Sequence, residues 1–132
     1  MRLVSLRLMP PAFRVDLFTP AAWATVAQNR KLRREEMQEI LDHMGRQPAL
    51  PTIMGGDFNA QSGDPSLNEV NRLYADAFYR SGAGWGHTAV NEFPLARIDR
   101  VFTSGPLNPK VMRVIQTEHS DHRMVVLDLA WP

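Results

Sequence analysis

The chain has 132 residues, of which 44% are hydrophobic and 22% are charged, a balance typical of a folded globular domain rather than a disordered segment. Its formal net charge of +1 provides no broad basic field, so binding to nucleic acid is neither implied nor excluded. The absence of cysteine excludes disulfides, thiolate metal ligands and a cysteine nucleophile, and it favours a cytoplasmic location without excluding export. No apolar stretch reaches the length needed to span a bilayer.

The first part of the chain is predicted to form a strand followed by a long helix. An apolar run over residues 3–8 indicates a buried strand rather than a signal peptide, and an irregular connection is expected over 12–18. Thr19 can cap a helix and Pro20 suits its first turn, so we expect a helix over residues 21–44. The apolar residues at helical spacing are expected to face the core: Trp23, Val26, Met37, Ile40, Leu41 and Met44.

The remainder reads as a short strand, a second helix and three further strands. The short strand covers residues 52–54, and Asp64 with Pro65 repeats the capping signal. The second helix is expected to end near Gly82 with Leu67, Val70, Leu73 and Ala77 facing inward. Strands over 97–103, 111–117 and 123–131 follow, the last two with apolar residues on both faces, as in strands covered on each side. This order predicts an α/β (α+β) fold with one mixed β-sheet and two helices.

Two short peptides carry groups that divalent-metal phosphate chemistry uses. They are Gly56-Asp57-Phe58-Asn59-Ala60, which follows an apolar run, and Ser120-Asp121-His122, which precedes one. Asp and Asn supply oxygen ligands, His supplies a nitrogen, and glycine lets the backbone approach a ligand closely. A third strand-like stretch between them contains Asp99.

The order of these motifs, GDFN, then IDxxF, then SDH, resembles the endonuclease/exonuclease/phosphatase (DNase I-like) family. That family includes DNase I, abasic-site endonucleases, sphingomyelinases and inositol-polyphosphate phosphatases. Because the family domain extends well beyond this length, the resemblance implies that residues 1–132 form a single partial domain whose N-terminal half is missing. The implied fold is half of a four-layer sandwich.

The resemblance also implies a metal-dependent phosphoester hydrolase in which water attacks phosphorus. Asp57, Asn59, Asp121 and His122 would assist this attack. Asp57, Asn59 and Asp121 would bind Mg²⁺ or Mn²⁺, and Asp57 would also orient or deprotonate the water. Asn59 and His122 would contact the substrate phosphate, where His122 stabilises charge or transfers a proton.

The resemblance makes Asp99 the partner that hydrogen-bonds His122 and fixes its tautomer. The sequence leaves an alternative open, because Asp99 is flanked by Arg97 and Arg100 and could pair with either of them. We expect Ser120 to cap the turn before His122 rather than to act as a nucleophile.

Two further residues are predicted to contact the substrate. Arg7 occupies the position where the family often has a histidine in the first strand; an arginine can bind phosphate but cannot act as a general acid at neutral pH. His87 lies in a loop of small residues that leaves room for a ligand. The alternatives are structural roles for both, and the neighbouring Trp85 could either stack on a base or sugar or pack under the loop.

A competing hypothesis is that the chain is not an enzyme. The family's first half supplies an Asn and a metal-binding Glu, and nothing before residue 3 provides them. The chain would then be a truncated or degenerate, inactive homologue that acts as an interaction module or forms a homodimer through an exposed sheet face. For the enzyme, nucleic acid, phospholipid and inositol phosphate all remain open as the phosphoester substrate.

Overall fold

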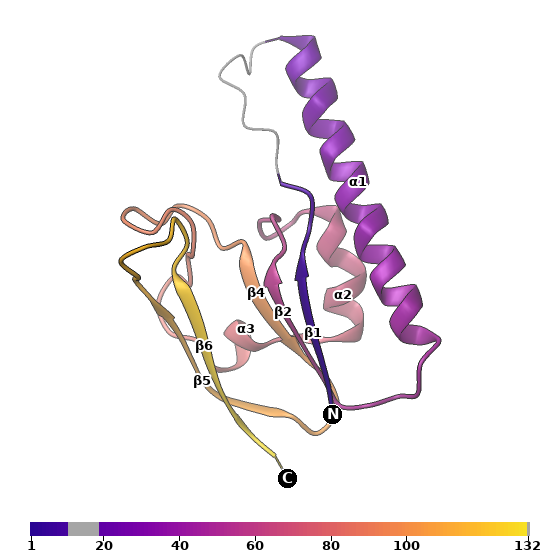
Figure 1. Cartoon of the computed structure of the whole chain (residues 1–132), viewed down its shortest axis with the longest axis vertical. Helices are drawn as coiled ribbons and strands as arrows, with labels where there is room; N and C mark the ends of the chain where they lie inside the picture. The colour runs from indigo at the N-terminus through magenta and orange to yellow at the C-terminus, as the bar shows by residue number, and fades with distance from the viewer. Residues whose placement is uncertain (11–18, 132) are drawn as a thin grey trace.

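The computed structural model describes residues 1–10 and 19–131, so the connection expected over 12–18 lies outside the described residues. It confirms the α/β class, with a mixed sheet and a few helices (Figure 1). The elements in chain order are β1 (Arg2–Arg7), α1 (Pro20–Gly45), β2 (Thr52–Asp57), η1 (Pro65–Leu67), α2 (Asn68–Leu73), β3 (Ala75–Asp76), α3 (Ala77–Ser81), β4 (Asp99–Thr103), β5 (Asn108–Ile115) and β6 (Met124–Ala130).

The mixed sheet has the strand order β1-β2-β4-β3. Strands β1 and β2 are parallel, with Arg7 opposite Asp57, whereas β4 runs antiparallel to β2 with Asp99 opposite Asp57. This register places three charged residues side by side at one end of the sheet. The motifs that contain Asp57 and Asp99 therefore meet at one end of the sheet.

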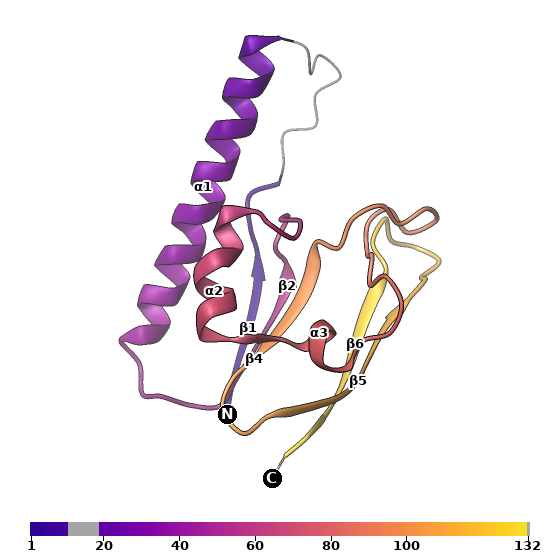
Figure 2. The same ribbon diagram turned by 180° about the vertical axis from the view of Figure 1, so that it is seen from behind.

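Helix α1 begins where the capping signal predicts, since the Thr19 hydroxyl accepts a hydrogen bond from the Ala22 N–H at 3.2 Å. Helices α1 and α2 cover the same face of the sheet (Figure 2), and a buried core fills the space between. The expected inward position of Trp23 is wrong, because this side chain is 63% exposed. In Figure 1 the first turns of α1 extend past the strand ends, where no sheet lies beneath them. The core contains Leu8, Met37, Leu41, Met44, Met54, Phe58, Ala60, Leu67, Val70 and Phe102.

The predicted second helix is divided into η1, α2 and α3. It starts as expected, with the Asp64 carboxylate accepting a hydrogen bond from the Ser66 N–H at 3.0 Å. The helix ends at Tyr74, whose backbone is extended, and the next two residues pair with β4 as strand β3. Because the chain leaves the helix there, Leu73 is half exposed rather than buried as predicted.

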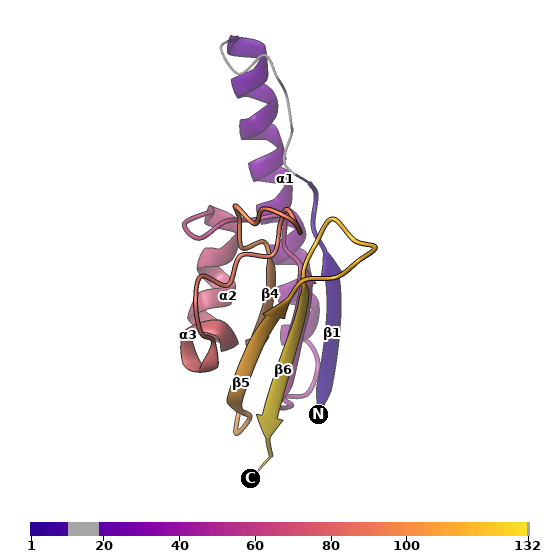
Figure 3. The same ribbon diagram turned by 90° about the vertical axis from the view of Figure 1, so that its left-hand side faces the viewer.

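Strands β5 and β6 form a separate two-stranded antiparallel sheet rather than joining the mixed sheet. Figure 3 shows this ribbon beside β4. The expectation that both strands are covered on each side is wrong, since Val111, Ile115 and Met124 are all exposed. The turn between β5 and β6 carries the Ser120-Asp121-His122 motif. Within the described ranges, no helix is both long and apolar enough to cross a membrane.

Candidate metal and phosphoester site

Asp57, Asp99 and His122 converge at the end of the mixed sheet. One ligand atom from each lies within 4.8 Å of those of the other two. Asp57 is the last residue of β2, Asp99 is the first of β4, and His122 lies in the turn before β6. All three side chains are partly buried, with 14%, 18% and 27% of the side chain exposed respectively.

Gly56 allows β1 and β2 to deliver Asp57 to this position. Its φ of +146° favours glycine, and a Cβ at this residue would overlap the main-chain carbonyl oxygen of Leu6. The backbone conformation and the close approach of β1 therefore explain why glycine occupies this position of the motif.

Asn59 folds the chain back over Asp57. Its φ is +49°, a left-handed conformation that Asn tolerates better than most residues. The Asn59 N–H donates to Asp57 Oδ1 at 2.9 Å, and its Nδ2 donates to Asp57 Oδ2 at 3.1 Å and to the Leu8 carbonyl at 2.8 Å. These bonds fix both carboxylate oxygens, and Asn59 Oδ1 accepts no hydrogen bond from the described part of the chain.

The pKa of Asp57 is raised above its ordinary value, first because burial disfavours the carboxylate and also because of the negative charge of Asp99. The Asn59 N–H, His122 and Arg7 act in the opposite direction. Arg7 only partly offsets the charge, since its Nε lies 3.7 Å from Asp57 Oδ2 and its side chain is 77% exposed. Two carboxylates with incomplete neutralisation are a suitable setting for a cation.

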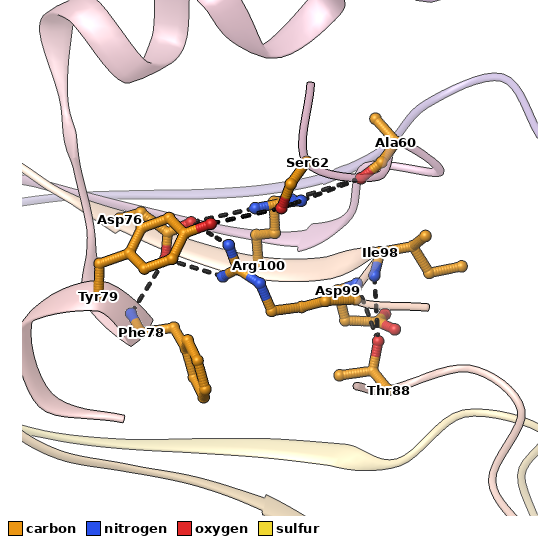
Figure 4. Close-up of polar contacts among 10 residues, drawn as sticks. Ala60, Ser62, Asp76, Phe78, Tyr79, Thr88, Ile98, Asp99 and Arg100 are labelled. Atoms are coloured by element: carbon orange, nitrogen blue, oxygen red, sulfur yellow. Dashed lines mark hydrogen bonds and ion pairs between the residues drawn. The ribbon is translucent and has the colours of Figure 1, made fainter. Parts of the chain in front are cut away.

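The Asp99 carboxylate holds the imidazole of His122. Asp99 Oδ2 lies 2.8 Å from His122 Nδ1. The Thr88 hydroxyl accepts hydrogen bonds from the Ile98 N–H at 3.3 Å and the Asp99 N–H at 3.1 Å, as Figure 4 shows. With Nδ1 held by a carboxylate, Nε2 is the ring atom available to a substrate.

The alternative partners of Asp99 are engaged elsewhere. Arg97 makes two hydrogen bonds to the Asp76 carboxylate at 3.0 and 2.8 Å, and Arg100 makes a third at 3.1 Å. All three side chains are buried. Because neighbouring residues of a strand point to opposite faces, Arg100 lies away from Asp99. The pairing of Asp99 with a flanking arginine is therefore excluded.

Sequence reasoning missed the residue that holds the His122 turn. Asn91 is buried, its Oδ1 accepts from the Thr117 N–H at 3.1 Å, and its Nδ2 donates to the Thr117 carbonyl. The Asn91 N–H donates to the Asp121 carbonyl at 2.8 Å, and its own carbonyl accepts from Arg123 Nε at 2.8 Å. The local sequence shows only an Asn in a loop, and the side chain of such an Asn usually bonds to the nearby backbone of a turn.

The other predicted site residues lie outside the convergent group. Asp121 is exposed, although it adjoins His122 in the same turn. Ser120 accepts a hydrogen bond from the His122 N–H at 3.1 Å, in line with its expected capping role. His87 is half-buried, with Nδ1 3.1 Å from the Pro94 carbonyl, and it lines a neighbouring cavity.

The fold and the acid–acid–histidine group define an α/β protein with a candidate metal and phosphate site. The sequence profile of the endonuclease/exonuclease/phosphatase family matches residues 3–122. The chain belongs to this family, as the order of the motifs predicted. A search among curated protein sequences finds no match.

Solved structures show the same fold. A conserved protein of unknown function from Enterococcus faecalis has a TM-score of 0.68 at 23% identity, covering 76% of this chain and 45% of its own. A mannosyl-6-phosphatase from Bacteroides thetaiotaomicron has a TM-score of 0.62 at 23% identity, with coverages of 79% and 46%. Beta toxin from Staphylococcus aureus has a TM-score of 0.67 at 19% identity, with coverages of 93% and 50%. The chain therefore spans about half the length of these structures.

Proposed function

We propose that this chain carries one wall of the active site of a Mg²⁺- or Mn²⁺-dependent phosphoester hydrolase, in which water attacks phosphorus. The observation that carries the proposal is the convergence of Asp57, Asp99 and His122 within 4.8 Å at the end of the sheet. Family membership supports the reaction class, and the named neighbours include a phosphatase.

The residues present fit a hard divalent cation. Asp57 and Asn59 offer oxygen atoms from one turn, and the raised pKa of Asp57 reflects burial and a nearby negative charge that a cation would relieve. Asp121, also proposed as a ligand, is exposed next to His122 and would have to turn toward this pair to bind the same cation. Mg²⁺ keeps several waters, so one or two carboxylates suffice to hold it. When bound, the cation would neutralise negative charge on the phosphoryl oxygens.

Side chains of the protein would position the water and the phosphate. Asp57 accepts a hydrogen bond from the attacking water and orients it. Asn59 Oδ1 accepts a second hydrogen bond from that water or contributes its oxygen to the cation, and the Arg7 guanidinium donates hydrogen bonds to the phosphate. Asp99 accepts the hydrogen bond from Nδ1–H of His122, and in the imidazolium form the Nε2–H donates to a phosphoryl oxygen. His122 thereby stabilises the charge that develops on the transferred group.

The proposal is tested by hydrolysis of bis-p-nitrophenyl phosphate with Mg²⁺ or Mn²⁺ and with EDTA. We expect cation-dependent turnover that Asp57→Ala and His122→Ala each reduce by about 100-fold or more, the range for loss of an acid–base group. Asp42→Ala, which removes an exposed carboxylate on α1, is the matched control and should leave the rate unchanged. Equal rates for the wild type and both site variants would contradict catalysis by this chain and favour the inactive-homologue hypothesis.

A further inference from the structure

A cavity of about 220 Å³ is lined by residues that lie close along the chain to those of the candidate site, and no step of the proposed reaction uses it. We call it the aromatic recess. It is formed by the segment after β2, helix α3 with the loop that follows it, and the segment before β4. The side chains that matter for its chemistry are Gln61, Ser62, Tyr79, Trp85, His87 and Arg97.

The chain connects the recess directly to the catalytic groups. Gln61 is two residues after Asn59, and Arg97 is two residues before Asp99. His87 precedes Thr88, whose hydroxyl accepts the hydrogen bond from the Asp99 N–H. Since consecutive Cα atoms are about 3.8 Å apart, these walls lie within the span of one substrate molecule from the site.

Aromatic rings dominate the open side of the recess. Trp85 is 83% exposed and Tyr79 is 70% exposed, so neither ring is used to fill the core. The Trp85 and His87 rings meet edge to face, with centroids 5.7 Å apart. Exposed aromatic rings beside a cavity provide stacking surfaces for a flat ligand group.

The recess is also polar and positively charged at its base. The Arg97 guanidinium lies 4.7 Å from the centroid of the Tyr79 ring, and Arg97 and Arg100 share a single carboxylate, that of Asp76. The Tyr79 hydroxyl lies 3.4 Å from Ser62 Oγ (Figure 4). The buried Arg97 guanidinium therefore backs the Tyr79 ring, and the exposed Gln61 and Ser62 can bond ring heteroatoms.

We infer that the aromatic recess binds a planar aromatic ring attached to the scissile phosphoester, such as a nucleobase or a phenol, by stacking on Trp85 and Tyr79. This inference rests on the proposed function, because it treats the recess as part of the same substrate site. It favours aromatic phosphoesters over sugar or inositol phosphates, whose rings have no flat π-face to stack.

The test compares the affinities of three probes by isothermal titration calorimetry: thymidine 5′-monophosphate, 4-nitrophenyl phosphate and ribose 5-phosphate. We expect thymidine monophosphate to bind about tenfold more tightly than ribose 5-phosphate, in line with base–aromatic stacking. Trp85→Ala should abolish that preference and Trp85→Phe should retain it. Trp23→Ala, which removes an exposed tryptophan on α1, should leave it unchanged.

The aryl probe identifies the feature that is recognised. Preference for both aromatic probes supports recognition of a flat ring, whereas preference for thymidine monophosphate alone supports recognition of a nucleobase through its polar edge. Equal affinity of the wild type for all three probes, or a preference that survives in Trp85→Ala, would overturn the inference.

The variant Asp57→Ala separates this inference from the proposed function. It should lose hydrolysis and keep the aromatic preference, because the recess does not include that carboxylate. Hydrolysis by the wild type without any aromatic preference would overturn the recess alone. An aromatic preference without cation-dependent hydrolysis would overturn the proposed function alone.

Discussion

Hydrogen bonding, burial and a neighbouring charge all act on the carboxylate of Asp57. Both of its oxygens accept hydrogen bonds from Asn59, yet burial and the charge of Asp99 keep its pKa above the ordinary value. A carboxylate in this state costs stability when it is ionised and no cation is bound. The proposed cation would relieve this cost by neutralising the ionised carboxylate.

This raised pKa makes stability depend on pH in a defined direction. As pH rises from the ordinary aspartate pKa of 3.8 through the raised folded-state pKa of Asp57, the folded state binds more protons than the unfolded state. Rising pH therefore lowers the free energy of unfolding in that window, and Asp57→Asn should remove this contribution. Urea unfolding of both proteins in EDTA, at a series of pH values from about 4 to 8, measures it.

The control for that series is Asp42→Asn, which neutralises an exposed carboxylate on α1. The wild type should lose stability relative to Asp57→Asn as pH rises, but keep a constant difference from Asp42→Asn. A constant difference from Asp57→Asn across the whole series would show that the carboxylate is not destabilised by its surroundings.

A second prediction concerns the Asp99–His122 pair. Asp99→Asn keeps the shape of the side chain but replaces the carboxylate that bonds His122 Nδ1 with a neutral amide. Loss of a partner that orients a functional histidine typically lowers activity by about 10- to 100-fold. We expect a loss of that size in kcat together with a change in the pH profile, measured by phosphodiester hydrolysis. An unchanged rate and profile would mean that the pair has only a structural role.

At the scale of elements, hydrogen bonds connect the loop before β4 to the turn before β6. Thr88 and Asn91 bond the backbone of β4 and of the His122 turn, and Arg123 returns its side chain to the Asn91 carbonyl. Two segments about thirty residues apart thus form one polar unit beneath the site. The position of His122 in the turn before β6 therefore depends on this unit.

Asn91→Ala tests the role of this unit in positioning. Removing the buried side chain leaves both main-chain polar groups of Thr117 without their partner, which costs about 1–3 kcal/mol. We expect faster hydrogen exchange at the Thr117 amide and a lower kcat with little change in KM. The exposed Asn71→Ala on α2 is the control and should change neither quantity. Normal kcat in a folded Asn91→Ala protein would contradict the positioning role.

A buried ion pair ties α1 to η1. Arg33 Nη2 lies 2.9 Å from Asp64 Oδ2, with 4% and 7% of the two side chains exposed. Although burial opposes it, hydrogen bonds from Ser66 and Arg33 hold the pKa of Asp64 below its ordinary value. Ionised Asp64 therefore stabilises the fold above its unfolded-state pKa, and this contribution is lost as pH falls through the lowered folded-state pKa.

Breaking this pair should strongly destabilise the protein. Asp64→Ala leaves Arg33 buried without its charged partner, and such losses cost about 3–5 kcal/mol. The exposed neighbour gives a matched comparison, because Arg34→Ala should stay within about 0.5 kcal/mol of the wild type. Chemical denaturation of the two variants measures the difference, and similar midpoints for both would contradict the structural role of the pair.

At the scale of the whole molecule, the sequence predicted the features that depend on local pattern. The structure contains the predicted first strand and the capped long helix, and it places Asp57 and Asp99 at strand ends. These features are predictable because capping, periodicity and turn formation depend on residues close together in the sequence. Asp99 was correctly matched to His122 through the family resemblance.

The features that the sequence did not predict depend on partners far along the chain. Arg33 lies in a charged run that reads as a solvated face, but it is buried because Asp64 meets it. The second helix breaks at Tyr74 because Ala75 and Asp76 pair with β4. Asp76 in turn binds the two arginines that flank Asp99, which no local pattern could show.

We propose that a divalent cation binds where Asp57, Asp99 and His122 converge. The chain has four histidines, so Mn²⁺ titration followed by NMR of the histidine imidazole resonances tests this claim directly. We predict that substoichiometric Mn²⁺ broadens the His122 resonance first, that His43, His87 and His119 follow only at higher Mn²⁺, and that Asp57→Ala weakens the effect. Uniform broadening of all four resonances, or first broadening of the exposed His119, would contradict the account.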